Sequence, residues 1–206
     1  MRRARGFPRS AVVVASVLAL AVVGCGGGGP AGAPARAVVG KPVHYVALGG
    51  DDVYGGRRSL TTAWPQLLFR KHLPVNATLV NLASPRHGGA EILRDQVPTA
   101  IRLHPDIVTI TLIDDLERAT PPQTVQRELS TIISELRTVD GVRILVGTAP
   151  PDTGTAEARS QFDSAVVAAA HALRDKIVDL SGVSATDADL RADQIAEAFG
   201  RQVATR

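Results

Sequence analysis

The chain has 206 residues, a formal net charge of +3 at pH 7, 45% hydrophobic residues and only 3% aromatic residues. This length predicts one domain of roughly 150 residues together with additional segments, and the scarcity of aromatic residues predicts an aliphatic core. A single cysteine excludes a disulfide bond within the chain.

An N-terminal targeting segment precedes the domain. Several arginines come before an apolar run over residues 11–23, which is too short for a membrane span of about 20 residues but typical of a signal peptide. The sequence VVGC, which ends at Cys25, resembles the bacterial lipobox. This resemblance implies cleavage after residue 24, acylation of Cys25, and an exported protein held by lipid on the cell membrane and facing outside the cytoplasm. A secretory signal with a chance cysteine is the alternative.

Removal of the signal changes the charge of the protein. Its four arginines are lost, which leaves 19 basic and 20 acidic residues and a formal charge of −1. No basic patch then argues for nucleic acid as a partner. Residues 25–40 are rich in Gly, Pro and Ala and predict a flexible tether, so the folded domain is expected over residues 41–206.

Strand and helix patterns alternate along the domain. A buried strand is expected first, over residues 44–48, followed by a helix over 60–73 in which Trp64 packs into the core. Thr120 is expected to cap the helix that follows the third strand, and Pro98 to kink the helix before that strand. Strands are expected over 44–48, 77–82, 106–112, 142–146 and 176–180, and helices over 60–73, 90–103, from 120, 162–173 and 190–203.

This alternation predicts an α/β fold with a parallel sheet of about five strands, covered by helices on both faces. Ligands bind beyond the carboxyl ends of the strands in such sheets. The functional residues are therefore expected in the loops 49–57, 83–89, 113–119, 147–155 and 181–189.

Three of these loops carry a family resemblance. Residues 45–56 read YVALGGDDVYGG, residues 64–68 read WPQLL, and residues 79–118 read LVNLASPRHGGAEILRDQVPTAIRLHPDIVTITLIDDLER. Their order and spacing over residues 42–118 resemble the SGNH, or GDSL, hydrolases. The resemblance implies a flavodoxin-like three-layer α/β/α sandwich and the hydrolysis of esters in acyl lipids or acylated sugars. It also implies a serine nucleophile, a late Asp-x-x-His pair, and an oxyanion hole made by the serine amide, a glycine amide and an asparagine side chain.

The residues expected for that chemistry are replaced in this chain. Asp51 or Asp52 stands in place of the serine, Arg86 or Gly88 in place of the glycine, and Asp114 or Asp115 in place of the asparagine. The late segment, residues 186–195, reads TDADLRADQI and contains no histidine. An acceptor in place of a donor opposes a developing oxyanion, so the family's reaction is expected to be lost or moved to other residues.

The four aspartates follow neighbouring strands and are expected to lie near one another. They could hold a divalent cation or a cationic ligand, or act as acid and base, although no cofactor is predicted with them. Alternatively, Asp51 and Asp114 bond loop amides while Asp52 and Asp115 face water.

Arg86 and His87 lie in the second loop of the same edge. They could bind an anionic group, but a salt bridge from Arg86 to one of the aspartates is expected. Ser84 and His87 could form a displaced nucleophile, although no third group supports this pair.

The sequence thus predicts an exported lipoprotein with an SGNH-like domain that has lost catalysis and binds a glycan, an acyl group or an envelope partner. An active ester hydrolase with relocated catalytic residues is the alternative. Ligand-binding candidates are Asp51, Asp52, Arg86, His87, Asp114 and Asp115.

Overall fold

A computed structural model describes residues 40–56, 60–184 and 186–204. The expected signal peptide, Cys25 and nearly all of the expected tether lie outside these residues. No helix within the described ranges is long and apolar enough to cross a membrane. The described residues belong to one compact unit, which contains two hydrophobic cores of its own.

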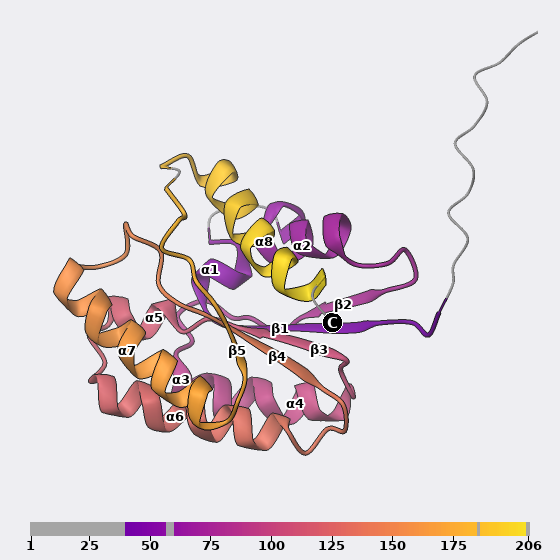
Figure 1. Ribbon diagram of the computed structural model, residues 1–206, viewed down its shortest axis with the longest axis horizontal. Coiled ribbons are helices and arrows are strands. Elements are labelled where there is room, and N and C mark those ends of the chain that lie inside the picture. Colours follow the sequence, from indigo (N-terminus) through magenta and orange to yellow (C-terminus); the bar gives the residue numbers. More distant parts are fainter. Residues whose placement is uncertain (1–39, 57–59, 185, 205–206) are drawn as a thin grey trace, which may run out of the picture. The chain divides into compact units, whose positions relative to one another are not determined.

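Five parallel strands form the centre of the domain, as the sequence predicted (Figure 1). Their order across the sheet is β2-β1-β3-β4-β5, so β1 and β3 are neighbours and β5 lies at one edge. Val46 in β1, for example, pairs with Val108 in β3, which in turn pairs with Ile144 in β4. The strands are β1 (His44–Leu48), β2 (Thr78–Asn81), β3 (Ile107–Ile110), β4 (Arg143–Gly147) and β5 (Lys176–Val178).

Helices cover both faces of this sheet, which confirms the three-layer α/β/α arrangement. Figure 1 shows α2 and α8 on one face and α4, α6 and α7 on the other. The helical segments are α1 (Asp51–Tyr54), η1 (Leu60–Thr62), α2 (Trp64–His72), α3 (Gly89–Glu91), η2 (Ile92–Gln96), α4 (Val97–Arg102), α5 (Ile113–Glu117), α6 (Pro122–Leu136), α7 (Ala156–Ala172) and α8 (Ala188–Ala204).

Alternating side chains of the strands supply the two cores. Tyr45 and Ala47 pack under α2 and α8, whereas Val46 and Leu48 pack against the opposite helices. Successive side chains of a strand point to opposite faces, so a strand without polar residues fits a sheet that is buried on both sides. The aliphatic composition thus fills both layers.

Trp64 links the helices of the first layer. Its ring stacks on that of Phe199 from α8, with the centroids 4.6 Å apart and the planes 11° apart. Both side chains are almost completely buried, which confirms the expected core position of Trp64. Such a pair adds attraction between aromatic rings to the burial of apolar area.

One local prediction requires correction. Thr120 does not cap α6, which begins at Pro122; its hydroxyl instead donates to Asp115 Oδ1 at 2.9 Å. At Pro98, where a kink was expected, the π-helical turn η2 ends and α4 begins, so the helix changes type there. Proline has no N–H to donate to the preceding turn, so a change of helix type ahead of it removes the conflict.

We expect Gly200→Ala to destabilise the protein. A Cβ at this position would lie 2.5 Å from the His72 ring, so α8 could no longer approach α2 as closely. The cost of such overpacking is about 1–3 kcal/mol, and thermal unfolding should show a lower melting temperature. Gly182→Ala, where a Cβ would meet nothing within 4 Å, is the matched control and should leave it nearly unchanged. Equal melting temperatures for the two variants would contradict this packing.

Candidate functional site

Two short helices bring the aspartates to the carboxyl edge of the sheet. α1 follows β1 and α5 follows β3, and these two strands are neighbours. Asp51, Asp52 and Asp114 therefore lie close enough for the first two to influence the third electrostatically. Asp115 points to a different set of partners, so three of the four expected carboxylates come together.

Asp114 is buried and bonds to the start of α1. Its Oδ2 accepts the backbone N–H of Asp51 at 2.9 Å. Gly50 makes this approach possible, since a Cβ there would lie 1.8 Å from that same oxygen. Burial raises the pKa of Asp114 to about 7; the bond from Asp51 opposes this shift, and the neighbouring negative charges, led by Asp52, add to it.

Asp52 keeps one carboxylate oxygen without a partner. Its Oδ2 accepts the Thr111 hydroxyl at 2.7 Å, while Oδ1 is buried and makes no hydrogen bond among the described residues. Burial raises the pKa of Asp52 to about 6, and the Thr111 hydroxyl and the Trp64 indole oppose the shift. The Trp64 Nε1 is also buried and makes no hydrogen bond of acceptable geometry. An unpaired acceptor and an unpaired donor thus lie near each other at this edge.

Asp115 is buried rather than exposed to water, contrary to one of the expected arrangements. It accepts the Gly89 N–H at 2.7 Å and the Thr120 hydroxyl at 2.9 Å. Arg118 Nη2 lies 3.6 Å from its Oδ1. These bonds fasten the second loop to α5 and identify Asp115 as a structural residue of the edge.

Arg118, not Arg86, is the arginine that neutralises this edge. It also lies 3.4 Å from Glu91 and donates to the backbone carbonyls of Asp114 and Arg86. Arg86 is exposed, and its side chain makes no ion pair among the described residues, so the expected Arg86 salt bridge is wrong. Arg118 reaches Asp115 because the two lie three residues apart at the end of α5, a helix that the sequence pattern did not reveal.

Gln96 fixes the loop after β1. Its Oε1 accepts the Gly49 N–H at 3.0 Å, and its Nε2 donates to the Gly49 carbonyl at 2.9 Å. The same Nε2 lies 3.3 Å from His87 Nδ1. His87 therefore supports a loop amide and does not face the aspartates. Gln96 was missed because only the π-helical turn carries it back to β1.

The expected Ser84–His87 pair does not form. The two residues are joined only by a turn, in which the His87 N–H donates to the Ser84 carbonyl at 3.2 Å. Within the part of the chain that the structure describes, no serine or threonine hydroxyl is hydrogen-bonded to a histidine.

The backbone donors of this edge are already occupied. The Asp51 amide donates to Asp114, and the Gly88 amide donates to Glu91 Oε2 at 2.9 Å. Gly88 is also tightly enclosed, because a Cβ there would lie 1.8 Å from Arg118 Nη2. Internal carboxylates thus accept the Asp51 and Gly88 amides.

A cleft of about 420 Å³ opens beside the aspartates. Apolar residues form much of its wall, with Asp51, Asp52 and Arg191 at polar positions. Arg191, from α8, is ion-paired with Asp152 and donates to the Thr153 hydroxyl at 3.2 Å. The apolar residues that line the cleft are Ala63, Trp64, Ile113, Ala188, Ala192 and Ile195.

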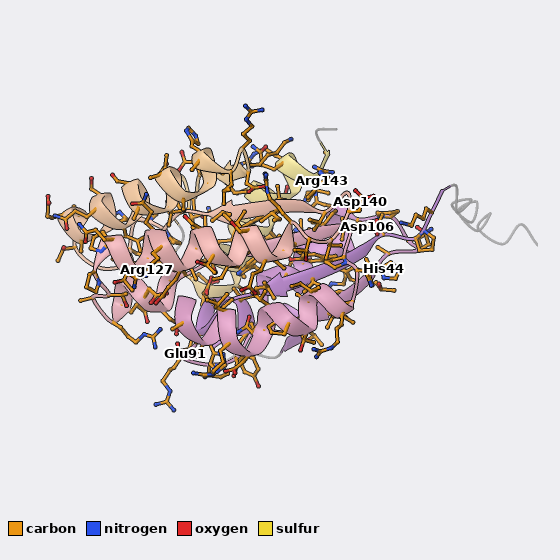
Figure 2. The ribbon with its side chains drawn as sticks, turned by 90° about the horizontal axis from the view of Figure 1, so that it is seen from below. His44, Glu91, Asp106, Arg127, Asp140 and Arg143 are labelled. Carbon is orange, nitrogen blue, oxygen red and sulfur yellow. The ribbon has the colours of Figure 1, made fainter. Side chains whose placement is uncertain are left out.

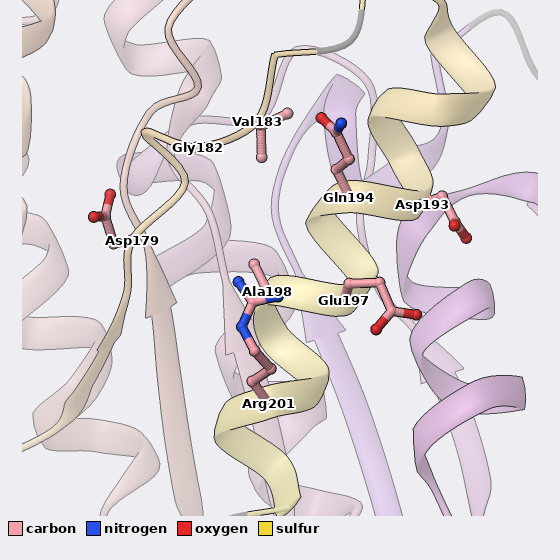
Figure 3. Close-up of a pocket in the computed structure, with 8 residues that line it drawn as sticks. All are labelled: Asp179, Gly182, Val183, Asp193, Gln194, Glu197, Ala198 and Arg201. Carbon is pink, nitrogen blue, oxygen red and sulfur yellow. The ribbon is translucent and has the colours of Figure 1, made fainter.

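No metal centre is seen at this edge. Among the described residues, no group of three or more His, Cys, Asp or Glu side chains is placed to hold a metal ion. A second hollow of about 200 Å³ lies against α8 and has acidic side chains on its wall (Figure 3). Figure 3 shows Asp179 and Glu197 on opposite sides of Arg201, so these carboxylates do not converge.

Comparison with known proteins identifies the family. The family model for GDSL-like lipases and acylhydrolases matches residues 45–199. The chain belongs to this GDSL-like family. No curated protein matches the sequence.

Solved structures of GDSL and SGNH proteins share the fold. A G-D-S-L family lipolytic protein from Desulfitobacterium hafniense DCB-2 has a TM-score of 0.66 and 15% identity, with 77% of this chain and 98% of that chain covered. The psychrotrophic esterase EstA from Pseudoalteromonas sp. has a TM-score of 0.63 and 16% identity, covering 77% and 97%. The SGNH-hydrolase family esterase AlinE4 has a TM-score of 0.61 and 24% identity, covering 73% and 83%.

We expect Asp114→Asn to flatten the dependence of stability on pH. The folded protein holds the Asp114 proton up to about pH 7, whereas the unfolded chain releases it near 3.8, so wild-type stability falls as pH rises between these values. Asparagine keeps an acceptor for the Asp51 amide without a charge. The wild type should lose about 1–3 kcal/mol more than the variant between about pH 5 and pH 8.

Thermal unfolding at a series of pH values measures this difference. Asp140→Asn, at an exposed position at the opposite end of the sheet, is the matched control and should follow the wild-type curve. Parallel curves for wild type and Asp114→Asn would show that the proton on Asp114 does not contribute.

Proposed function

We propose that this GDSL-like protein is an exported, lipid-anchored relative of the family's hydrolases that binds a ligand and does not cleave esters. The main support is the hydrogen bond from the Asp51 amide to the buried Asp114 carboxylate. This contact supports a match in which Asp51 takes the serine position of the family pattern and Asp114 the asparagine position, and we propose that register.

The chemistry of an oxyanion hole explains why this bond matters. Ester hydrolysis by the family requires N–H donors that are free to receive the oxygen of a tetrahedral intermediate. In this chain Asp114 already accepts one such donor, and Glu91 accepts the Gly88 amide. An oxyanion would have to displace a carboxylate from the amide and would then lie beside that carboxylate. Repulsion between the two negative charges would raise the energy of the intermediate that the oxyanion hole has to stabilise.

The nucleophile and its base are also missing from the described part of the site. Asp51 has a carboxylate where the family has a hydroxyl, and no described hydroxyl is bonded to an imidazole. The segment that resembles the late Asp-x-x-His region enters α8 and places Arg191 on the cleft. A guanidinium is a cationic donor with no acceptor, so Arg191, which is ion-paired with Asp152, supplies no base for proton abstraction.

The cleft nevertheless has the character of a binding site. Its apolar wall can cover an acyl chain or the apolar face of a sugar ring, and Asp52 Oδ1 can accept one hydroxyl hydrogen. We therefore propose an acylated or alkylated glycan as the ligand class. The arginines, apolar run and VVGC sequence of the first 25 residues support an envelope location with an anchor on Cys25.

We expect no turnover of p-nitrophenyl acetate or butyrate above the uncatalysed rate. A fluorophosphonate probe should likewise leave every serine unlabelled, since no hydroxyl within residues 40–56, 60–184 and 186–204 is hydrogen-bonded to a histidine. Mass spectrometry of the probe-treated protein measures this directly. A labelled serine, with both label and turnover lost in its alanine variant, would instead establish a hydrolase with relocated residues.

Ligand binding can be followed through Trp64, the single tryptophan of the chain. We expect octyl glucoside, kept below its micelle concentration, to change the Trp64 emission in a saturable way, because the ring lines the cleft. Asp52→Asn should weaken this binding about tenfold, since a hydrogen bond to a charged acceptor is lost. Asp140→Asn is the control. No saturable change, or equal affinity in wild type and Asp52→Asn, would remove the cleft as the binding site.

A further inference from the structure

Basic residues line the end of the sheet opposite the cleft. Lys41 precedes β1, Arg102 ends the helix before β3, Arg143 begins β4, and Arg174 and Lys176 flank the start of β5. These strands are consecutive across the sheet, so the five residues lie at one end of it, here called the basic edge. Arg143 is held there by the backbone carbonyls of Gln202 and Val203, to which it donates at 2.9 and 3.2 Å. Figure 2 shows Arg143 at this end of the described unit, together with His44, Asp106 and Asp140.

Acidic residues at the same end are mostly engaged internally. Asp106 accepts the His44 N–H at 2.8 Å and Lys41 Nζ at 3.3 Å, and Asp175, whose side chain is 8% exposed, pairs with Arg137 at 3.0 Å. Asp140 remains as an exposed carboxylate. Arg102 is exposed and donates to a neutral hydroxyl, that of Thr99, at 2.9 Å. The basic edge therefore presents an excess of positive charge.

The opposite end carries the contrasting charge. Asp51, Asp52 and Glu117 line the cleft there, with Asp114 buried behind them. Arg191 also lines the cleft and Arg118 lies beside Asp115, so the contrast is one of more carboxylates at the cleft end and more cations at the basic edge. An anionic surface would attract the basic edge and repel the cleft.

The position of the chain start connects this polarity with the membrane. The described chain begins at Gly40, just before β1 and at the basic edge. Cys25 lies about 15 residues earlier, a distance of no more than about 50 Å even when fully extended. Val75, which is 69% exposed, lies in the connection before β2 at the same end and adds an aliphatic side chain.

We infer that the basic edge docks on the anionic phosphate headgroups of the lipid bilayer and holds the cleft away from it. This inference rests on the proposed lipid anchor, which keeps the edge near the bilayer. Attraction between basic side chains and an anionic bilayer acts within about one Debye length, roughly 8 Å, and weakens with salt. The lipid anchor keeps the domain near the bilayer, and the charge of the basic edge turns that end of the domain toward the headgroups.

Vesicle flotation with the unacylated chain from residue 26 onward tests the surface separately from the anchor. This segment contains the whole compact unit with both of its cores. It should float with vesicles of phosphatidylcholine and about 40% phosphatidylglycerol in about 50 mM NaCl, and dissociate in about 500 mM NaCl. It should not float with pure phosphatidylcholine. Absence of binding to the anionic vesicles would overturn the inference.

Two variants with the same change in net charge locate the contact. Reversal at the basic edge, with Arg102→Glu, Arg174→Glu and Lys176→Glu, should weaken binding at least tenfold. The control reverses three exposed arginines elsewhere, Arg86→Glu, Arg94→Glu and Arg127→Glu, and should stay within about threefold of wild type. Circular dichroism shows whether each variant is folded. Equal losses in both variants would mean that net charge, and not this edge, attracts the protein.

A separate measurement addresses the anchor. An alkyne-tagged fatty acid supplied to cells should label the full-length protein and not its Cys25→Ala variant. If the protein floats with anionic vesicles but carries no label, the lipid anchor is refuted and the docking of the basic edge stands. If the protein is labelled but does not float, the anchor stands and the docking of the basic edge is refuted.

Discussion

The candidate site depends on one close approach between a carboxylate and a backbone amide. Asp114 can reach the Asp51 N–H only because Gly50 has no side chain in its path. The sheet order makes the contact possible, since the loops after β1 and β3 are neighbours. An unpaired buried carboxylate costs free energy. Burial therefore raises the pKa of Asp114, and the hydrogen bond from the Asp51 amide offsets part of that cost.

The fold of this edge also rests on contacts other than the one between Asp114 and Asp51. The residues that fasten the loops, Gln96 to Gly49 and Asp115 to Gly89, use contacts that are separate from any nucleophile. Arg118 adds charge compensation at the same edge. The architecture of this edge and the walls of the cleft are therefore supported without a serine–histidine pair.

The sequence predicted the sheet and its covering helices because buried strands and amphipathic helices leave strong periodic patterns. Short helices such as α1 and α5 leave none, and the residues they orient were consequently misjudged. Arg118 was overlooked in favour of Arg86, because only a helical turn brings Arg118 back to Asp115. The Thr120 hydroxyl does not cap α6 because it donates to Asp115, five residues earlier and at the end of α5, a contact that helix propensity does not reveal.

Trp64 lines the cleft and also packs on Phe199 in the core, so the wall of the cleft is part of the packing between α2 and α8. The indole is both a wall of the cleft and the surface on which α8 rests, while Arg191, Ala192 and Ile195 of that helix form the facing wall. A molecule held between these walls touches both halves of a helix–helix interface. Binding in the cleft and the packing of α8 on α2 are therefore coupled. A bound molecule would stabilise the contact between the two helices, and a weaker contact would widen the cleft and lower its affinity.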